Sequence, residues 1–319
     1  TEASQNEVAG AADFNSLLKE HQRSWRHLWQ RCGIDLEAAD SRVSQILNLH
    51  IFHLLQTVSV HCIDQDVGVP PRGLHGEAYR GLIMWDELFV FPFLNLRIPD
   101  LTRALLKYRY RRLPQAKKAA RAAGYAGAMF PWQSGSNGRE EAQTLHLNPE
   151  SGHWVPDNTQ LQRHINIAVA YNVWLYYQVT GDLDFMSFYG AEIIIETARF
   201  WASIARYNDS LDRYEIKGVM GPDEFHTGYP DAPQPGLDNN TYTNVMAVWL
   251  FCRALDILEF LPSNRLRPLQ ENLAIEQKEI DRWNDISRKM RIVYHDDNIL
   301  SQFEGYDNCL LYTSPSPRD

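Results

Sequence analysis

Two long apolar segments joined by a three-residue turn constrain the fold of this chain more than any other feature. Residues 160–179 and 182–207 carry apolar side chains nearly all round a helical period, and only "TGD" links the two patterns. A link this short forces consecutive helices to run antiparallel. Helices that are apolar on nearly every side belong in an interior. The sequence therefore predicts an all-α fold built from helical hairpins.

The same helical spacing recurs along the rest of the chain. Further helices are expected at 14–31, 36–59, 84–97, 101–113, 239–259 and 268–291. Three long irregular segments interrupt them, at 63–81, 124–158 and 207–238, and these are rich in Gly, Pro, Asn and Asp. Each segment follows an odd member of the helix series, so all three can emerge from one end of the array. Short turns at one end and long loops at the other are typical of an α/α toroid, and we find no fixed-period repeat of the kind that indicates a solenoid.

The pattern divides the chain into three parts. Residues 1–35 are predicted to be an N-terminal linker helix, which Gly33 ends. Residues 36–308 carry the hairpin pattern and are predicted to form the barrel. The last residues, 309–319, leave the helical pattern for Ser and Pro and are interpreted as a non-native tail.

Charge and composition exclude several kinds of partner. The formal net charge is −9 and no basic face is visible, whereas nucleic-acid binding depends on such a face. The densest basic run, 107–124, has Lys and Arg at helical spacing and is predicted to be one solvated helix face. The four cysteines form no CxxC pair, so neither a zinc site nor a disulfide framework is indicated. No apolar run approaches the roughly twenty residues that span a bilayer, and the start lacks a signal-peptide core. We expect a soluble, cytoplasmic protein without nucleic-acid or membrane partners.

Two tryptophans on separate long loops each stand beside a polar side chain. Trp85 and Asp86 open a helix after a glycine-bearing loop, and Trp132 precedes Gln133. An aromatic face beside a carboxylate suits a sugar ring, which stacks on the aromatic while its hydroxyls donate to the acid. The alternatives are capping of the helix by Asp86 or Glu87 and a Trp anchor in a surface loop. Together the two pairs predict the walls of a polyol pocket.

A loop of sixteen residues, "GVMGPDEFHTGYPDAP" at 218–233, carries a further candidate. The apolar "YEIKGVMGP" with its two glycines is expected to hold Glu224 in a walled position of low dielectric. Burial raises the pKa of a carboxyl and keeps it protonated near neutrality, as a general acid requires. The alternative is a solvated loop acid. His226 has no second His at ligand spacing, so no metal site is predicted.

Two polar residues at helix starts have open interpretations. Asn239, in "LDNNTYTN", either caps the following helix or binds sugar hydroxyls. His164 lies on an apolar helix face and is either a core histidine or part of the pocket rim.

Several longer stretches resemble a known family. "GEAYRGLIMWDELFVFPF", "YRYRRLPQAKKAARAAGYAGAMFPWQS", "TGDLDF", "ETARFWAS", "GPDEFH" and "NNTYTNVMAVW" follow the order and spacing of glycoside hydrolase family 65. That family includes maltose, trehalose and kojibiose phosphorylases and some α-glucoside hydrolases. The resemblance runs from about residue 40 to about 308 and implies a catalytic α/α barrel of six hairpins, incomplete at the C-terminus in this chain.

The resemblance also implies roles for individual residues. Glu224 would be the general acid, and Trp85, Asp86 and Trp132 would line the subsite of the cleaved glucose. The reaction would invert: Glu224 protonates the glycosidic oxygen while phosphate or water attacks the opposite face of the ring. The substrate would be a small α-glucoside such as kojibiose, maltose or trehalose, with inorganic phosphate as co-substrate of a phosphorylase and no other cofactor.

Some features remain open on the sequence alone. Gln133 stands where the phosphorylases carry Glu, and "GSNGREE" is longer than their equivalent loop, so the acceptor specificity stays open. The longer loop alone favours hydrolysis over phosphorolysis. The residues that would activate the nucleophile are expected beyond the end of the chain, so the isolated polypeptide is expected to be inactive. A homodimer is an expectation for the full-length parent. The competing interpretation is a non-catalytic, glycan-binding α/α toroid.

Overall fold

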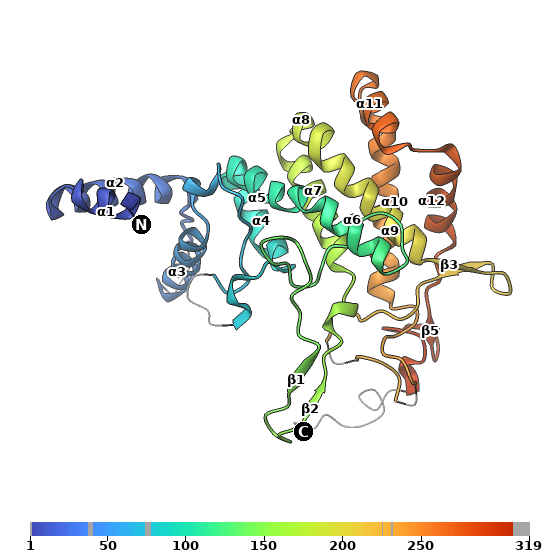
Figure 1. Cartoon of the computed structure of the whole chain (residues 1–319). Helices are drawn as coiled ribbons and strands as arrows, with labels where there is room; N and C mark the ends of the chain where they lie inside the picture. Colours follow the sequence, from blue (N-terminus) through green and yellow to red (C-terminus); the bar gives the residue numbers. More distant parts are fainter. Residues whose placement is uncertain (1, 38–40, 74–77, 225, 231, 309–319) are drawn as a thin grey trace. The chain divides into compact units, whose positions relative to one another are not determined.

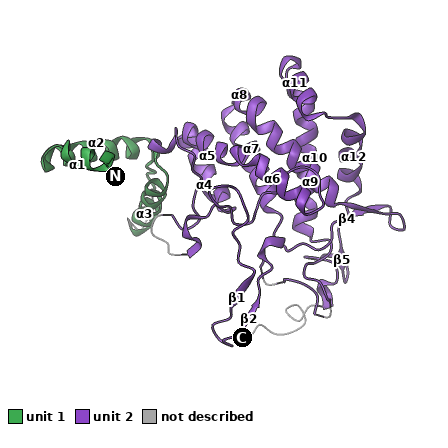
Figure 2. Ribbon diagram, viewed as in Figure 1, with its two compact units in different colours: residues 1–59 green, residues 60–319 purple. Residues whose placement is uncertain are grey.

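The computed structural model describes residues 2–37, 41–73, 78–224, 226–230 and 232–308. The chain forms two compact units, residues 1–59 and 60–319 (Figure 2). The predicted tail at 309–319, with Cys309, lies outside the described residues. Within the described part, no helix combines the length and apolarity needed to cross a bilayer.

The first unit consists of α1 (Glu2–Ala9), α2 (Phe14–Cys32) and α3 (Ser41–Thr57). The helix expected at 14–31 is confirmed: Asp13 caps its start by accepting hydrogen bonds from the amides of Asn15 (2.9 Å) and Ser16 (3.3 Å). Gly33 ends it, as predicted.

The third helix of this unit, α3, is less buried than its composition predicts. A helix that is apolar on most of its circumference is expected to be buried, but Val43, Ile46 and Leu49 are 45%, 52% and 52% exposed. Ile51 and Leu55 are buried. Helix α3 therefore buries only one of its sides, although apolar residues surround most of it.

The second unit is a two-layered array of helical hairpins (Figure 1). Helices α4, α7 and α10 pack side by side, and α5, α9 and α12 pack against them. The predicted all-α toroid fold is thereby confirmed, although the described helices do not close into a ring. The helices of this unit are α4 (Glu87–Arg97), α5 (Pro99–Arg111), α6 (Leu113–Ala122), α7 (Ile165–Thr180), α8 (Leu183–Phe185) with a π turn (Met186–Gly190), α9 (Ala191–Ile204), α10 (Thr241–Phe260), α11 (Ser263–Leu273) and α12 (Gln277–Lys289).

The hairpin around "TGD" forms as predicted. Helix α7 ends at Gly181, whose φ of 66° is in the left-handed region that favours glycine. Asp182 then caps the next helix by accepting a hydrogen bond from the amide of Phe185 at 2.8 Å. The same carboxylate accepts from Tyr176 (2.9 Å) and Arg103 (2.8 Å), so the turn is tied to α7 and α5.

Two expectations about helices are wrong in detail. The pattern at 268–291 is two helices, because Ala274 adopts a left-handed φ of 47° between α11 and α12. The basic run at 107–124 is split between α5 and α6, and two of its cations are buried rather than solvated. Arg109 is 1% exposed and pairs with Glu87, and Arg112 is 7% exposed and pairs with Asp66 at 2.6 Å.

The three irregular segments lie at the same end of the second unit, as predicted. In Figure 1 the turns at α8 and α11 are at the top of the array, and the long loops are at the bottom. The loops of the second unit contain short antiparallel hairpins and single 3₁₀ turns. The strands are β1 (Leu145–Leu147) with β2 (Trp154–Pro156), β3 (Arg206–Asn208) with β4 (Arg213–Glu215), and β5 (Tyr294–His295) with β6 (Ile299–Leu300); the 3₁₀ turns are Val60–Cys62, Ala78–Gly81, Thr159–Leu161 and Tyr306–Asn308.

Candidate active site

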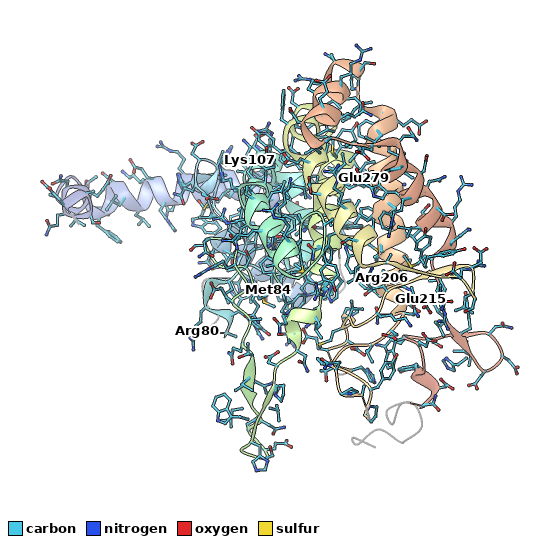
Figure 3. All side chains as sticks on the ribbon, turned by 45° about the vertical axis from the view of Figure 1, so that its right-hand side comes forward. Arg80, Met84, Lys107, Arg206, Glu215 and Glu279 are labelled. Carbon is cyan, nitrogen blue, oxygen red and sulfur yellow. The ribbon has the colours of Figure 1, made fainter. Side chains whose placement is uncertain are left out.

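The long loops meet at two adjoining cavities that share Tyr79, Trp132 and Glu224. The first cavity, of about 460 Å³, also contains Trp85 and Asp86. The second cavity, of about 560 Å³, extends from Trp132 towards the β1–β2 hairpin. Figure 3 shows Arg80, which lines the second cavity, at the loop end of the helices below Met84. Each of the three irregular segments contributes to these walls.

Trp85 and Asp86 reach the first cavity from the start of α4. Asp86 occupies the N-cap position, but its carboxylate makes no capping hydrogen bond. Glu87 does not cap the helix either: its carboxylate is buried and pairs with Arg109 at 3.1 Å. Arg109 also donates to the carbonyl of Met84 at 2.8 Å, which fixes the backbone immediately before Trp85.

The loop "GSNGREE" folds back onto Trp132. One carboxylate oxygen of Glu140 accepts a hydrogen bond from the amide of Trp132 at 2.7 Å. The other accepts from the amides of Gln133 and Ala142, both at 3.0 Å. The loop therefore fixes the backbone of Trp132, whose side chain is only 2% exposed.

His164 lies behind the two indoles. Its ring centroid is 4.8 Å from that of Trp85 and 5.3 Å from that of Trp132. The side chain is 1% exposed, and burial lowers its pKa to about 4, so the ring is neutral at physiological pH. Of the two interpretations from the sequence, the position matches a core histidine, since His164 lines neither cavity.

Glu224 stands between the two cavities at a left-handed φ of 61°. One of its carboxylate oxygens, Oε1, accepts a hydrogen bond from Nε2 of Gln162 at 3.2 Å. The side chain is exposed, which differs from the walled position expected from the sequence. The reason is that the apolar residues Ile216, Val219 and Met220 turn into the core beneath the loop instead of covering the carboxylate.

A second carboxylate next to Glu224 is partly buried. Burial raises the pKa of Asp86, and the charge of Glu224 pushes it in the same direction, while Arg72 opposes the rise. Asp86 therefore lies in a less polar environment than a solvated carboxylate, on the same cavity wall as Glu224.

Asp223, the neighbour of Glu224, is fixed from two sides. Its Oδ2 lies 2.5 Å from Nδ1 of His226 and also accepts a hydrogen bond from Gln302. His226 thus holds the loop in place. Within the described residues, no group of three or more His, Cys, Asp or Glu could hold a metal ion.

Asn239 lies away from both cavities. It is fully buried at a φ of 51°, and it donates to Glu304 at 2.7 Å and accepts from the amide of Ile216 at 3.3 Å. Its neighbour Asn240 caps α10 by accepting from the amide of Thr243 at 3.0 Å. Asn239 therefore supports the base of the loop that carries Glu224, and the structure does not bring it to the sugar-binding walls.

Three residues at or beside the cavities are not singled out by the sequence: Arg72, Tyr79 and Gln162. Arg72 and Tyr79 lie in the first irregular segment, and the predicted convergence of the three loops is the one signal that could have placed them near Glu224. Gln162 carries no sequence signal of its own, because a glutamine just before a helix is common.

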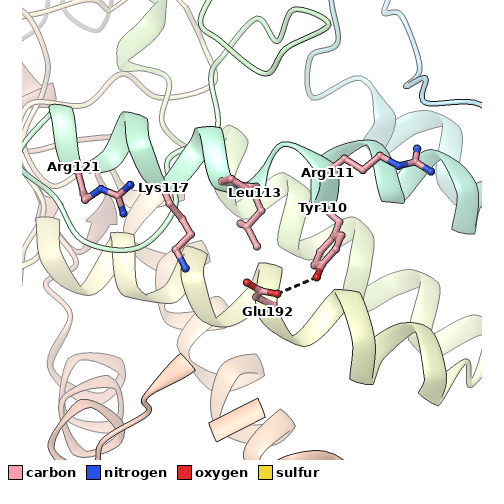
Figure 4. Close-up of a pocket in the computed structure, with 7 residues that line it drawn as sticks. Tyr110, Arg111, Leu113, Lys117, Arg121 and Glu192 are labelled. Atoms are coloured by element: carbon pink, nitrogen blue, oxygen red, sulfur yellow. Dashed lines mark hydrogen bonds between the residues drawn. The ribbon is translucent and has the colours of Figure 1, made fainter. Parts of the chain in front are cut away.

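A third cavity, of about 510 Å³, lies between α5, α6 and α9 (Figure 4). Cations line it, including Lys117 and Arg121, and Tyr110 donates to Glu192 at 3.2 Å. Trp85, Trp132 and Glu224 are absent from its walls. The residues predicted from the sequence to bind a sugar therefore lie at the loop end of the helices and not at this cavity.

Comparisons with known proteins identify the family of the chain. The family model described as "Glycosyl hydrolase family 65 central catalytic domain" matches residues 48–312. An uncharacterized glycosyl hydrolase from Mycobacterium tuberculosis is 53% identical over 296 residues, which are 93% of this chain and 22% of that protein. A kojibiose phosphorylase from Halothermothrix orenii is 38% identical over 309 residues, 93% of this chain and 38% of that protein.

Two further relatives extend the comparison. A trehalose 6-phosphate phosphorylase from Lactococcus lactis is 36% identical over 299 residues, 93% of this chain and 37% of that protein. Among solved structures, a human-microbiome protein assigned as a kojibiose phosphorylase superimposes with a TM-score of 0.79 at 27% identity, covering 96% of this chain and 40% of the other. The chain thus spans well under half the length of each of these relatives.

Proposed function

The chain belongs to glycosyl hydrolase family 65, and from this premise we propose that it provides the general acid and the glucose-binding walls of a site that cleaves an α-glucosidic bond. The observation that carries the proposal is the cavity in which Glu224 meets Trp85, Asp86 and Trp132. An acid beside two indoles and a second carboxylate can hold a pyranose ring and protonate the oxygen that leaves it.

In this proposal Glu224 acts through one of its two oxygens. Gln162 donates to Oε1, which leaves Oε2 to carry the proton and transfer it to the glycosidic oxygen. The buried indole of Trp132 packs against Trp85 with ring centroids 5.8 Å apart and supports it, so that Trp85 offers the sugar a rigid wall and Asp86 accepts hydrogen bonds from the sugar hydroxyls. The nucleophile attacks the opposite face of the ring, so the anomeric configuration inverts.

Phosphorolysis is the first candidate for the overall reaction. Relatives 36% and 38% identical to the chain are phosphorylases of trehalose 6-phosphate and of kojibiose. Inorganic phosphate would then be the co-substrate, and a small α-glucoside such as kojibiose, maltose or trehalose the donor. A cytoplasmic location and a homodimer of the full-length parent stay predictions.

Hydrolysis is the second candidate, and it rests on the long loop after Trp132. Glu140 belongs to that loop and fixes the backbone of Trp132 and Gln133. The length of the loop therefore has a structural role whether phosphate or water attacks. Cleavage of the three disaccharides with and without phosphate separates the two reactions.

The test of the proposed function is Glu224→Gln in a polypeptide of the relatives' full length that contains this chain. We expect cleavage to fall at least about a thousandfold while disaccharide binding is retained, because the amide keeps the shape but has no proton to give. Glu150→Gln, at the exposed tip of the β1–β2 hairpin, is the matched control. Undiminished cleavage by Glu224→Gln would refute the proposal, and absence of cleavage in the parent with normal binding would favour a glycan-binding module.

A further inference from the structure

The second cavity contains more acidic than basic side chains. Glu141, Asp157 and Glu224 line it, and Arg80 is the one Lys or Arg among its described lining residues. His146, from β1, and Tyr79 are the other titratable side chains of the described wall. The first cavity has the same imbalance, with three acids, Asp86, Asp223 and Glu224, and the cation Arg72. A ligand that spans both cavities therefore meets an excess of negative charge along its whole length.

Two acids, Glu141 and Asp157, are specific to the second cavity, and their described contacts include no buried cation. Glu141 lies 3.8 Å from Arg139, but both side chains are largely exposed, at 40% and 65%, so this pair neutralises little. Asp157 accepts a hydrogen bond from the amide of Thr159 at 3.0 Å, which is an uncharged donor. Neither contact removes the excess of carboxylates.

The neutral polar groups of the cavity are suited to hydroxyls. Gln133 and Gln143 offer amide donors and acceptors, and Glu141 and Asp157 offer acceptors for hydroxyl protons. A phosphate ester, by contrast, brings about 1.5 to 2 negative charges at neutral pH and needs cationic or amide donors. Its approach to the carboxylates of Glu141 and Asp157 is unfavourable by Coulomb's law, and Arg80 is the one Lys or Arg among the described lining residues to compensate.

Resting on the proposed function, we infer that the second cavity binds the group released on cleavage and selects an uncharged sugar or polyol over a phosphorylated one. One of the relatives is a phosphorylase of trehalose 6-phosphate, so the two classes of substrate are a real choice within this family. Because the first cavity is acid-rich as well, a phosphorylated disaccharide is disfavoured in either orientation.

The test compares trehalose with trehalose 6-phosphate as probes of the purified 319-residue chain, with dissociation constants measured by saturation-transfer difference NMR. We expect trehalose to bind at least about tenfold more tightly at low ionic strength, and the difference to shrink as salt is added. The double variant Glu141→Gln/Asp157→Asn should reduce the preference several-fold by improving binding of the phosphorylated probe. Both substitutions keep the shape, and the amide oxygen introduced by Asp157→Asn can still accept from Thr159. Glu150→Gln, which lies outside both cavities, should leave the ratio unchanged.

Equal or tighter binding of trehalose 6-phosphate, no binding of trehalose, or a ratio that the double variant does not change would each overturn the inference. Failure of the proposed function has a different signature: Glu224→Gln would then retain cleavage whatever the preference between the two probes. A protein that cleaves neutral and phosphorylated disaccharides equally well, but loses both activities in Glu224→Gln, would refute only the inference about charge.

Discussion

Gln162 donates a hydrogen bond from Nε2 to Oε1 of Glu224 across 3.2 Å, and its own Oε1 lies 3.3 Å from Nε2 of His164. Gln162 has no exposed surface, so its amide cannot turn freely. With His164 neutral, its Nε2 proton can donate to Gln162, which orients the amide with its NH₂ group towards the carboxylate. Two buried side chains thereby set the position of an exposed acid.

Replacing Gln162 by Leu should lower kcat about ten- to a hundredfold and leave KM nearly unchanged. Leu removes the donor that holds Glu224 but adds no group to either cavity, so the sugar-binding walls stay intact. The measurement is steady-state kinetics in the full-length context. Gln160→Leu, at an exposed position two residues earlier, is the control. An equal fall in kcat and rise in KM would show that Gln162 only supports the fold.

His164 should make the chain less stable as the pH falls. Its pKa is lowered from 6.5 to about 4 by burial, so the neutral form is favoured in the folded state. The contribution of neutral His164 to the free energy of unfolding is therefore fully present above pH 6.5, and it is lost as the pH falls from 6.5 towards 4. The loss attributable to this one side chain is roughly 3 kcal/mol over the whole window.

Urea unfolding at pH 7.5 and pH 4.5 tests the role of His164. His164→Gln should be less stable than the parent at pH 7.5, because an aromatic contact with two indoles is lost. Between pH 7.5 and pH 4.5 the free energy of unfolding should fall by about 2 kcal/mol less in the variant than in the parent. His153→Gln, an exposed position, should follow the parent at both pH values. Parallel pH dependence in His164→Gln and the parent would contradict the assignment.

The sequence was most informative where local rules decide the structure. "TGD" demanded a tight turn, and Gly181 and Asp182 supply its left-handed residue and its cap. Non-local packing set the features that were not predicted. Ala274 breaks a helix without glycine or proline, and the apolar residues before Glu224 point into the core because the loop crosses over the hairpins. Which face of a loop meets the core depends on contacts far away in the sequence, so spacing alone could not show that Glu224 is exposed.

Arg109→Met should destabilise the second unit by about 3 to 5 kcal/mol, because Glu87 would keep a buried charge without a partner. The double variant Glu87→Gln/Arg109→Met should recover a large part of this loss, since no buried charge remains. Thermal or urea unfolding of the single and double variants gives the comparison. Arg139→Met, which removes an exposed cation, should change stability by less than about 0.5 kcal/mol. If the double variant is no more stable than Arg109→Met, an unpaired charge on Glu87 is not what destabilises the single variant.

Position 221 requires glycine because the side chain of Asn240 packs closely against it, and not because of its φ angle. A Cβ at this position would lie 2.3 Å from Nδ2 of Asn240, closer than any real contact. Asn240 caps α10 through Thr243 and also donates to the carbonyl of Gln302 at 3.3 Å. The loop that carries Glu224 therefore packs directly on the cap of a core helix.

Gly221→Ala should cost about 1 to 2 kcal/mol, the usual loss when an N-cap is displaced, and it should lower activity because the loop moves with the cap. Asn240→Ala removes both the clash and the cap, so adding Gly221→Ala to it should cost little more. A double-mutant cycle followed by urea unfolding measures this coupling, which we expect to exceed about 0.5 kcal/mol. Additive costs in the double variant would mean that Gly221 and Asn240 act independently, and the argument that the cap positions the Glu224 loop would then be wrong.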